Sequence, residues 1–324
     1  MRLARRAFLG LLAGGLAPSN ARAQAPGPPH RIGWLSSEAA RPDPFVDGFR
    51  EGLQKLGYVD GRDFVLELRY TAPNVDALRA AFDELVKARV AFVVSSGFAI
   101  QATKAVRDTT VLFAISGDPV ALGIAQSLAR PGGNFTGSTF MSLEVAGKRV
   151  ALLKEAVPRI RTLAALSNVQ HPGEPAEHRA TETAAQAVGV KLVYAPFAAA
   201  SELDAALAGI REARPDALIV FPDAPTLVNR AKLAQFAVVQ RLPSMFGWSE
   251  YADAGGLMSY GANTREAYVR LATYADRLLR GAKPGELPIE QPTRFELVVN
   301  LKTAQALGIT MPPPLRLAAD RVIE

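Results

Sequence analysis

The sequence of 324 residues contains no cysteine. This absence excludes disulfide bonds, thiolate metal ligands, a catalytic thiol and the lipid-modified N-terminal cysteine of a lipoprotein. Histidine is scarce too, with three copies, His30, His171 and His178. His30 lies in a linker, and the other two flank a Pro/Gly-rich loop and the helix after it. We therefore expect surface positions for them, in preference to metal-binding or acid–base roles.

Common catalytic motifs are also missing. The chain has no G-x-x-x-x-G-K-[ST], no H-E-x-x-H and no G-x-S-x-G. Its nearest glycine-rich turn, residues 132–137, carries Asn134 where a dinucleotide fingerprint needs its second glycine, and it precedes a strand instead of a helix. We expect a protein that is not an enzyme and that holds no cofactor and no metal.

The first 23 residues have the features of a cleaved export signal. Arg5 and Arg6 precede Phe8 and Leu9, as in twin-arginine signals. The apolar run 7–17 is shorter than the roughly 17–25 residues of a membrane span. Small residues at 21 and 23 form a cleavage pattern that would leave Gln24 first. A general secretory signal with two incidental arginines is the alternative, and both routes predict a periplasmic protein.

Removal of this leader changes the charge balance. The leader carries four of the 37 basic residues and no acidic one, which leaves 33 basic against 31 acidic residues. The high pI of the precursor, about 9.6, is therefore largely a property of the leader. The sequence gives no reason to expect nucleic-acid binding.

Short apolar runs alternate with amphipathic helical stretches through the rest of the chain. Most runs are continuously apolar, as parallel strands buried on both faces are. In the stretch 44–56, Phe45, Phe49 and Leu53 fall on one helical face. The alternation predicts an α/β protein with two doubly wound parallel sheets. The predicted strands are 32–35, 64–70, 91–95, 111–115, 134–138, 163–166, 191–195, 217–221, 243–246 and 256–260.

About 300 mature residues exceed what one core usually holds, so we expect two lobes. After the signal 1–23 and a linker 24–30, lobe 1 is predicted to take 31–138 plus about 256–285. Lobe 2 takes 139–255 plus about 286–324. Several extended crossings between two lobes would form a hinge.

Polar residues follow the predicted strands, where open α/β sheets bind their ligands. Small hydroxyl residues and glycines there can leave backbone N–H groups free for an anion. The structural alternative is ordinary helix capping. These candidates are Ser36, Ser37, Ser96, Gly97, Ser116, Gly117, Asp118, Asn168 and Asp223.

Six segments spread over nearly the whole chain carry a resemblance to a known family. They are RIGWLSS at 31–37, FREGLQKLGYVDGR at 49–62, GDPV at 117–120, RPGGNFTG at 130–137, GGLMSYG at 255–261 and QPTRFELVVNLKTAQALGI at 291–309. The chain resembles the ABC-transporter substrate-binding proteins of the tryptophan/tyrosine type, and the last segment is the most specific.

The resemblance implies a type I periplasmic binding fold, in which two lobes close on a small ligand and pass it to a permease in the inner membrane. It implies a monomer that binds a small molecule, an amino acid or an aromatic compound. A periplasmic sensor for a membrane receptor is an alternative with the same fold. A cofactor enzyme exported by the twin-arginine route is a further one.

In an amino-acid-binding member, the candidate residues would bind different groups of the ligand. Serines of the first lobe and Gly97 would hold the carboxylate, and Asp223, or else Asp118, would face the ammonium group. For Asp118, a turn or helix cap before Pro119 is the structural alternative. Aromatic walls for the side chain are predicted from Phe221, Phe246, Trp248 and Tyr260, with core or inter-lobe packing as the alternative for Phe246 and Trp248.

Overall fold

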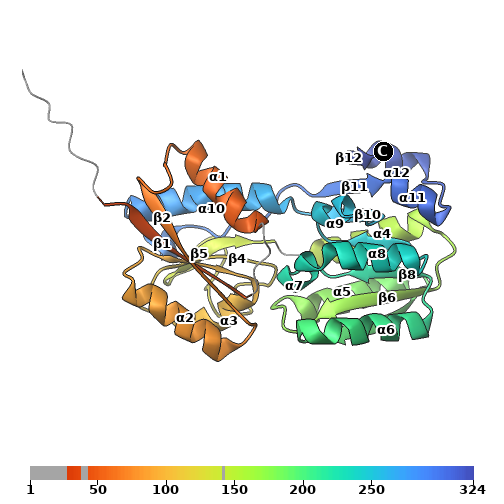
Figure 1. The fold of residues 1–324 in the computed structure, drawn as a ribbon, viewed down its shortest axis with the longest axis horizontal. Helices are drawn as coiled ribbons and strands as arrows, with labels where there is room; N and C mark the ends of the chain where they lie inside the picture. Colours follow the sequence, from red (N-terminus) through yellow and green to blue (C-terminus); the bar gives the residue numbers. More distant parts are fainter. Residues whose placement is uncertain (1–27, 38–42, 141–142) are drawn as a thin grey trace, which may run out of the picture.

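The computed structural model describes residues 28–37, 43–140 and 143–324. The predicted export signal and residues 24–27 of the predicted linker lie outside the described residues. Within that part of the chain, no helix is long and apolar enough to cross a membrane. The elements form two α/β lobes that lie side by side (Figure 1).

The first lobe is built on a five-stranded parallel sheet in the order β2-β1-β3-β4-β5. Its inner strands are apolar on both faces because helices cover both. The strands are β1 (His30–Ser37), β2 (Phe64–Thr71), β3 (Val93–Ser96), β4 (Val111–Ile115) and β5 (Phe135–Thr139). The helices are α1 (Pro44–Lys55), α2 (Val75–Lys87), η1 (Gly97–Ala99), α3 (Ile100–Thr103), α10 (Thr264–Leu279) and η3 (Pro284–Glu286).

The local sequence of helix α1 determines where the helix begins and how closely it packs beside the cleft. The Asp43 carboxylate caps it by accepting from the backbone N–H of Phe45 at 3.0 Å, and Pro44 begins it. Its buried face packs against α10, where a Cβ on Gly52 would lie 2.4 Å from the Val269 carbonyl oxygen. The glycine therefore permits the close helix contact that brings the first turn of α1 to the cleft.

The second lobe is built on a seven-stranded sheet in the order β12-β11-β10-β9-β8-β6-β7. All neighbours are parallel except β10 and β11. The strands are β6 (Thr162–Asn168), β7 (Lys191–Phe197), β8 (Ala217–Val220), β9 (Ser244–Phe246), β10 (Met258–Gly261), β11 (Glu296–Asn300) and β12 (Arg321–Ile323). The helices are α4 (Leu143–Ala156), α5 (Glu174–Ala187), η2 (Ala200–Glu202), α6 (Leu203–Ala213), α7 (Ala224–Val228), α8 (Arg230–Val239), α9 (Ser249–Asp253), α11 (Leu301–Leu307) and α12 (Pro313–Ala318).

The predicted fold class is confirmed, and all ten predicted strands occur. One part of the predicted lobe division is wrong. Residues from about 256 were assigned to the first lobe, but β10 pairs with β9 and β11 and so belongs to the second sheet. The chain returns to the first lobe only at α10. Strands β11 and β12 are not among the predicted strands.

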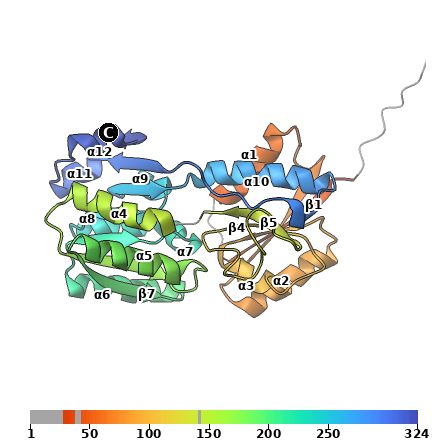
Figure 2. The same ribbon diagram turned by 180° about the vertical axis from the view of Figure 1, so that it is seen from behind.

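The chain passes between the lobes three times, and the second and third crossings can be followed in Figures 1 and 2. The first follows β5, the second is Ala262–Asn263 between β10 and α10, and the third leads into β11. The third crossing is tied to the first sheet, since Glu290 donates its N–H to the Gly137 carbonyl at 2.9 Å. Chain crossings between two lobes are suited to act as a hinge.

Candidate functional site

A cavity lies between the two lobes, at the carboxyl ends of β1, β3 and β4 on one side and of β6 and β8 on the other. Its empty volume, counted together with the space at its open mouth, is about 430 Å³. The lining residues are Ser37, Phe45, Ser96, Gly97, Phe98, Ala114, Ile115, Ser116, Phe140, Asn168, His171, Asp223, Ala224, Pro225, Trp248 and Tyr268.

Seven of the predicted site residues line this cavity. They come from six separate places in the chain, because the carboxyl ends of parallel strands converge at one edge of each sheet. The seven are Ser37, Ser96, Gly97, Ser116, Asn168, Asp223 and Trp248.

Three predicted polar residues lie outside it. Ser36 is buried in β1, and its hydroxyl lies 3.4 Å from the Ser37 carbonyl oxygen. The Gly117 carbonyl accepts from Thr139 Oγ1 at 2.8 Å. The Asp118 carboxylate accepts from the Val120 N–H at 2.8 Å, so it has the turn-capping role that the sequence left open.

Three predicted aromatic residues do not line the cavity either. Phe221 belongs to the core on one face of the second sheet, together with Ile219. Phe246 stacks on Tyr251 in the core, with ring centroids 4.9 Å apart. Tyr260 packs against Phe295 at 6.1 Å. Both faces of this sheet are covered, so apolar strand residues point into core layers and not into the cleft.

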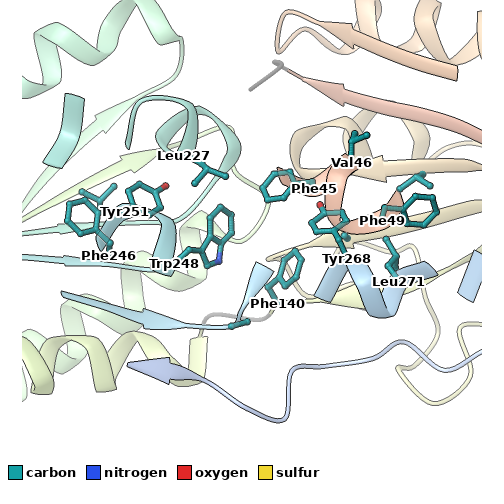
Figure 3. Close-up of a cluster of buried hydrophobic side chains, with 14 of the residues drawn as sticks. Phe45, Val46, Phe49, Phe140, Leu227, Phe246, Trp248, Tyr251, Tyr268 and Leu271 are labelled. Carbon is teal, nitrogen blue, oxygen red and sulfur yellow. The ribbon is translucent and has the colours of Figure 1, made fainter. Parts of the chain in front are cut away.

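An aromatic cluster of Phe45, Phe140, Trp248 and Tyr268 spans the cleft instead (Figure 3). Phe45 stacks on Tyr268 within the first lobe at 4.8 Å between centroids, and it meets Trp248 of the second lobe edge-on at 6.0 Å. Phe140, beside the first crossing, lies 6.4 Å from Trp248. The lobes therefore touch through aromatic rings, which can separate around a flat apolar group.

Asp223 supplies the acidic group of the cavity. It caps α7, with Oδ1 accepting from the Thr226 N–H at 2.8 Å and from Thr226 Oγ1 at 2.6 Å. Its Oδ2 is buried and has no hydrogen-bond partner among the described residues, although the Asn168 amide lies near enough to favour the charged form. Burial raises the pKa of Asp223 to about 6. An incoming cation would therefore find an unpaired carboxylate oxygen.

A buried ionic network lies behind Asp223. Arg149 Nη1 on α4 lies 2.6 Å from Glu177 Oε1 on α5, and Arg149 Nε donates to the Tyr260 carbonyl at 2.7 Å. Glu174 accepts from Ser167 Oγ and from the Tyr194 hydroxyl. Burial, opposed by Arg149 and reinforced by the negative charge of Asp223, raises the pKa of Glu177 to about 7. The carboxyl groups of Glu174, Glu177 and Asp223 thus accompany the single guanidinium of Arg149. This excess of acidic groups favours a cationic group in the cavity.

His171 departs from the sequence expectation. The predicted surface position is wrong, because the ring is only 7 % exposed and lines the cavity. Its Nε2 lies 2.7 Å from Ser116 Oγ in the opposite lobe. Burial lowers the pKa of His171 to about 4, so the imidazole is neutral in this arrangement. The described residues contain no group of three or more His, Cys, Asp or Glu that could hold a metal ion.

The comparison with known families agrees with this geometry. The sequence profile of the ABC transporter substrate binding proteins matches residues 37–323. The chain belongs to this family. A relative in it, the tyrosine-binding protein of Clostridioides difficile (strain R20291), is 21 % identical over 278 residues, which are 85 % of this chain and 78 % of that protein.

Solved structures show the same fold as this ABC transporter substrate-binding protein. A conserved domain protein from Vibrio cholerae has a TM-score of 0.83 at 22 % identity, over 91 % of this chain and all of that one. The ABC domain from Streptococcus pneumonia in complex with L-Trp has a TM-score of 0.82 at 22 % identity and the same coverage. The fold is that of the type I periplasmic binding proteins.

Proposed function

We propose that the protein captures an amino acid with an aromatic side chain in the inter-lobe cavity, and that it does so as the solute-binding component of an ABC importer. The observation that carries the proposal is the unpaired, buried Oδ2 of Asp223 in a cavity walled by aromatic rings. A primary ammonium group supplies three donors for such an oxygen, and an apolar side chain suits the rings.

The carboxylate end would bind to the first lobe. Ser37, Ser96 and Ser116 place hydroxyl groups around that part of the cavity. No side chain caps the first turn of η1, and we assign the backbone N–H groups at Gly97 and Phe98 to the carboxylate as well. The ammonium would thus face the second lobe and the carboxylate the first, so that both lobes are needed for full binding.

The aromatic assignment draws support from two relatives as well as from the cluster. One bears the name of a tyrosine-binding protein, and the structure of another contains L-Trp. In this chain, an indole or phenol ring would enter between Trp248 of one lobe and Phe45 and Phe140 of the other. Edge-on and offset contacts with these rings would stabilise it.

The cellular role proposed for the protein follows from the family and from the leader. Solute-binding proteins of importers work outside the inner membrane, and the predicted export signal supports a periplasmic location. A role in binding also fits the site, whose polar groups are arranged to hold opposite charges. We propose that the protein is not an enzyme and that a permease receives its ligand.

A thermal-shift screen against amino acids, aromatic acids, amides, sugars and nucleosides tests the ligand class. A ligand at about 100 times its Kd adds roughly 2.7 kcal/mol to the free energy of unfolding. At roughly 2–4 °C per kcal/mol, the melting temperature should rise by several degrees with an aromatic amino acid. Stabilisation by sugars or nucleosides alone would contradict the proposal.

Gly173 offers a test of lobe closure. A Cβ at this position would lie 2.5 Å from the Ser116 carbonyl oxygen of the opposite lobe, and the φ of −91° is one that alanine adopts freely. Gly173→Ala should therefore keep the lobes apart and weaken ligand binding, by about 1–3 kcal/mol or roughly 5- to 150-fold in Kd. Calorimetric titration of the ligand found in the screen measures the change.

Gly209→Ala is the matched control, because a Cβ there meets nothing within 4 Å. Its Kd should equal that of the wild type. An unchanged Kd for Gly173→Ala would mean that the ligand binds without the contact between Gly173 and Ser116.

A further inference from the structure

His171 is held by a hydrogen bond that crosses the cleft. It follows β6 of the second lobe, and its partner Ser116 follows β4 of the first. We propose that this pair is a proton-sensitive latch, which keeps the lobes together while the imidazole is neutral and releases them when it is protonated. This inference rests on the proposed function, in which the cleft closes on a ligand. It adds that pH controls the closure.

The packing against the pair is tight on the side of the loops that carry it. The backbone of Gly173 lies against the Ser116 carbonyl, and a Cβ on Gly117 would approach Pro172 to 3.3 Å. His171 Nδ1 is buried and has no partner among the described residues. A second proton on the ring would therefore put an unpaired charge into this contact, and opening the cleft is the way to hydrate it.

Several ionisable groups lie on the elements packed around the ring. Asp118 is beside Ser116 and is engaged with the Val120 N–H. Glu174 begins α5 and accepts from Ser167 and Tyr194. Asp223 lines the same cavity, and Glu177 behind it is paired with Arg149. Burial nevertheless sets the direction, because it lowers the pKa of His171 to about 4 despite these carboxyl groups.

The difference between the pKa values of His171 in the open and closed forms gives the direction and the size of the pH effect on closure. In an open cleft, the exposed imidazole would titrate near its ordinary pKa of about 6.5. The proton therefore binds the open form more strongly, and closure is lost as the pH falls through about 6.5 toward 4. From pH 8 to pH 5, protonation of His171 by itself should lower the ratio of closed to open protein about 30-fold.

The acids of the cavity respond in the opposite direction. Burial raises the pKa of Asp223 in the closed arrangement, so acid neutralises a carboxylate that is poorly solvated there. The same holds for Glu177 to the extent that opening exposes it. Without His171, acidification should therefore leave closure unchanged or favour it. A loss of closure in acid is a signature of the imidazole.

The absence of natural cysteine permits a clean distance measurement. Val86→Cys and Val239→Cys place one label on each lobe, at side chains that are 42 % and 66 % exposed. Distances between the two labels are recorded from pH 8 to pH 5 in ligand-free protein that carries the wild-type residue or His171→Gln. Glutamine can still bond to Ser116 but does not titrate in this range. His178→Gln, on α5 and stacked on Tyr194, is the matched control.

The expected result is that, from pH 8 to pH 5, the closed-to-open ratio falls about 30-fold further in the wild type and in His178→Gln than in His171→Gln, whose ratio stays constant or rises. The proposal is overturned if the ratio changes with pH in His171→Gln as it does in the wild type. No ligand is added, so an error in the proposed ligand class cannot imitate either result. That class is tested separately at pH 8, where the latch is neutral.

Discussion

Replacing Asp223 with alanine should weaken binding of the amino-acid ligand about 30-fold to several thousand-fold. Its Oδ2 is the buried oxygen without a partner that we assign to the ammonium group. Removing one side of a buried charge pair costs about 2–5 kcal/mol, because the other charge remains desolvated. Titration calorimetry at pH 8, where the wild-type carboxyl is ionised, measures the loss.

Two variants control this experiment. Asp118→Ala removes the other candidate acid, which caps a turn outside the cavity, and should leave Kd unchanged. Ser96→Ala removes a cavity hydroxyl that also bonds to the Tyr268 hydroxyl at 2.7 Å, and it should cost less than Asp223→Ala, about 0.5–1.5 kcal/mol for a neutral bond. Equal Kd values for the wild type and Asp223→Ala would remove the proposed ammonium site.

Arg149→Met should lower the free energy of unfolding by about 3–5 kcal/mol at pH 8. The guanidinium and its partner Glu177 are both almost fully buried, so the variant leaves a carboxylate without compensation. The loss should shrink as the pH falls. The folded-state pKa of Glu177 is already raised to about 7, removal of Arg149 raises it further, and the protonated acid carries no charge to compensate. Denaturant unfolding at pH 8 and pH 6 tests both statements.

The double variant Arg149→Met/Glu177→Leu should recover most of that stability, since it removes both charges and keeps apolar volume. Arg280→Met is the surface control. Arg280 is the C-cap residue of α10 and pairs with Asp276, four residues earlier. Its guanidinium is 72 % exposed, so a change in stability near the measurement error is expected. A double variant as unstable as Arg149→Met would show that the charge on Glu177 is not the cause.

The polar half of the site could be predicted from the sequence because it depends on topology. Ser37, Ser96, Ser116, Asn168 and Asp223 each lie at or just after the end of a parallel strand, and those ends converge whatever the angle between the lobes. The apolar runs identified the strands for a similar physical reason, since strands buried on both faces must be continuously apolar.

The aromatic residues and His171 of the site depend on contacts between the lobes, which no local sequence pattern encodes. Phe45 and Tyr268 belong to helices whose apolar residues predict only a buried face. Phe221 was misassigned because its strand is apolar throughout, so the sequence does not tell which face meets which layer. His171 lies in a loop whose Pro and Gly residues indicated exposure, whereas the opposite lobe covers it.

Calorimetry with L-Trp and L-Tyr, each compared with its amine and its acid analogue, tests capture of an amino-acid zwitterion between the lobes most directly. Tryptamine and tyramine lack the carboxylate, and the indole and phenol propionates lack the ammonium group. If the ammonium faces Asp223 and the carboxylate faces the serines of the first lobe, one of the two amino acids should bind at least 30-fold more tightly than both of its analogues. Binding of an amine or an acid analogue as tight as that of its parent amino acid would contradict it.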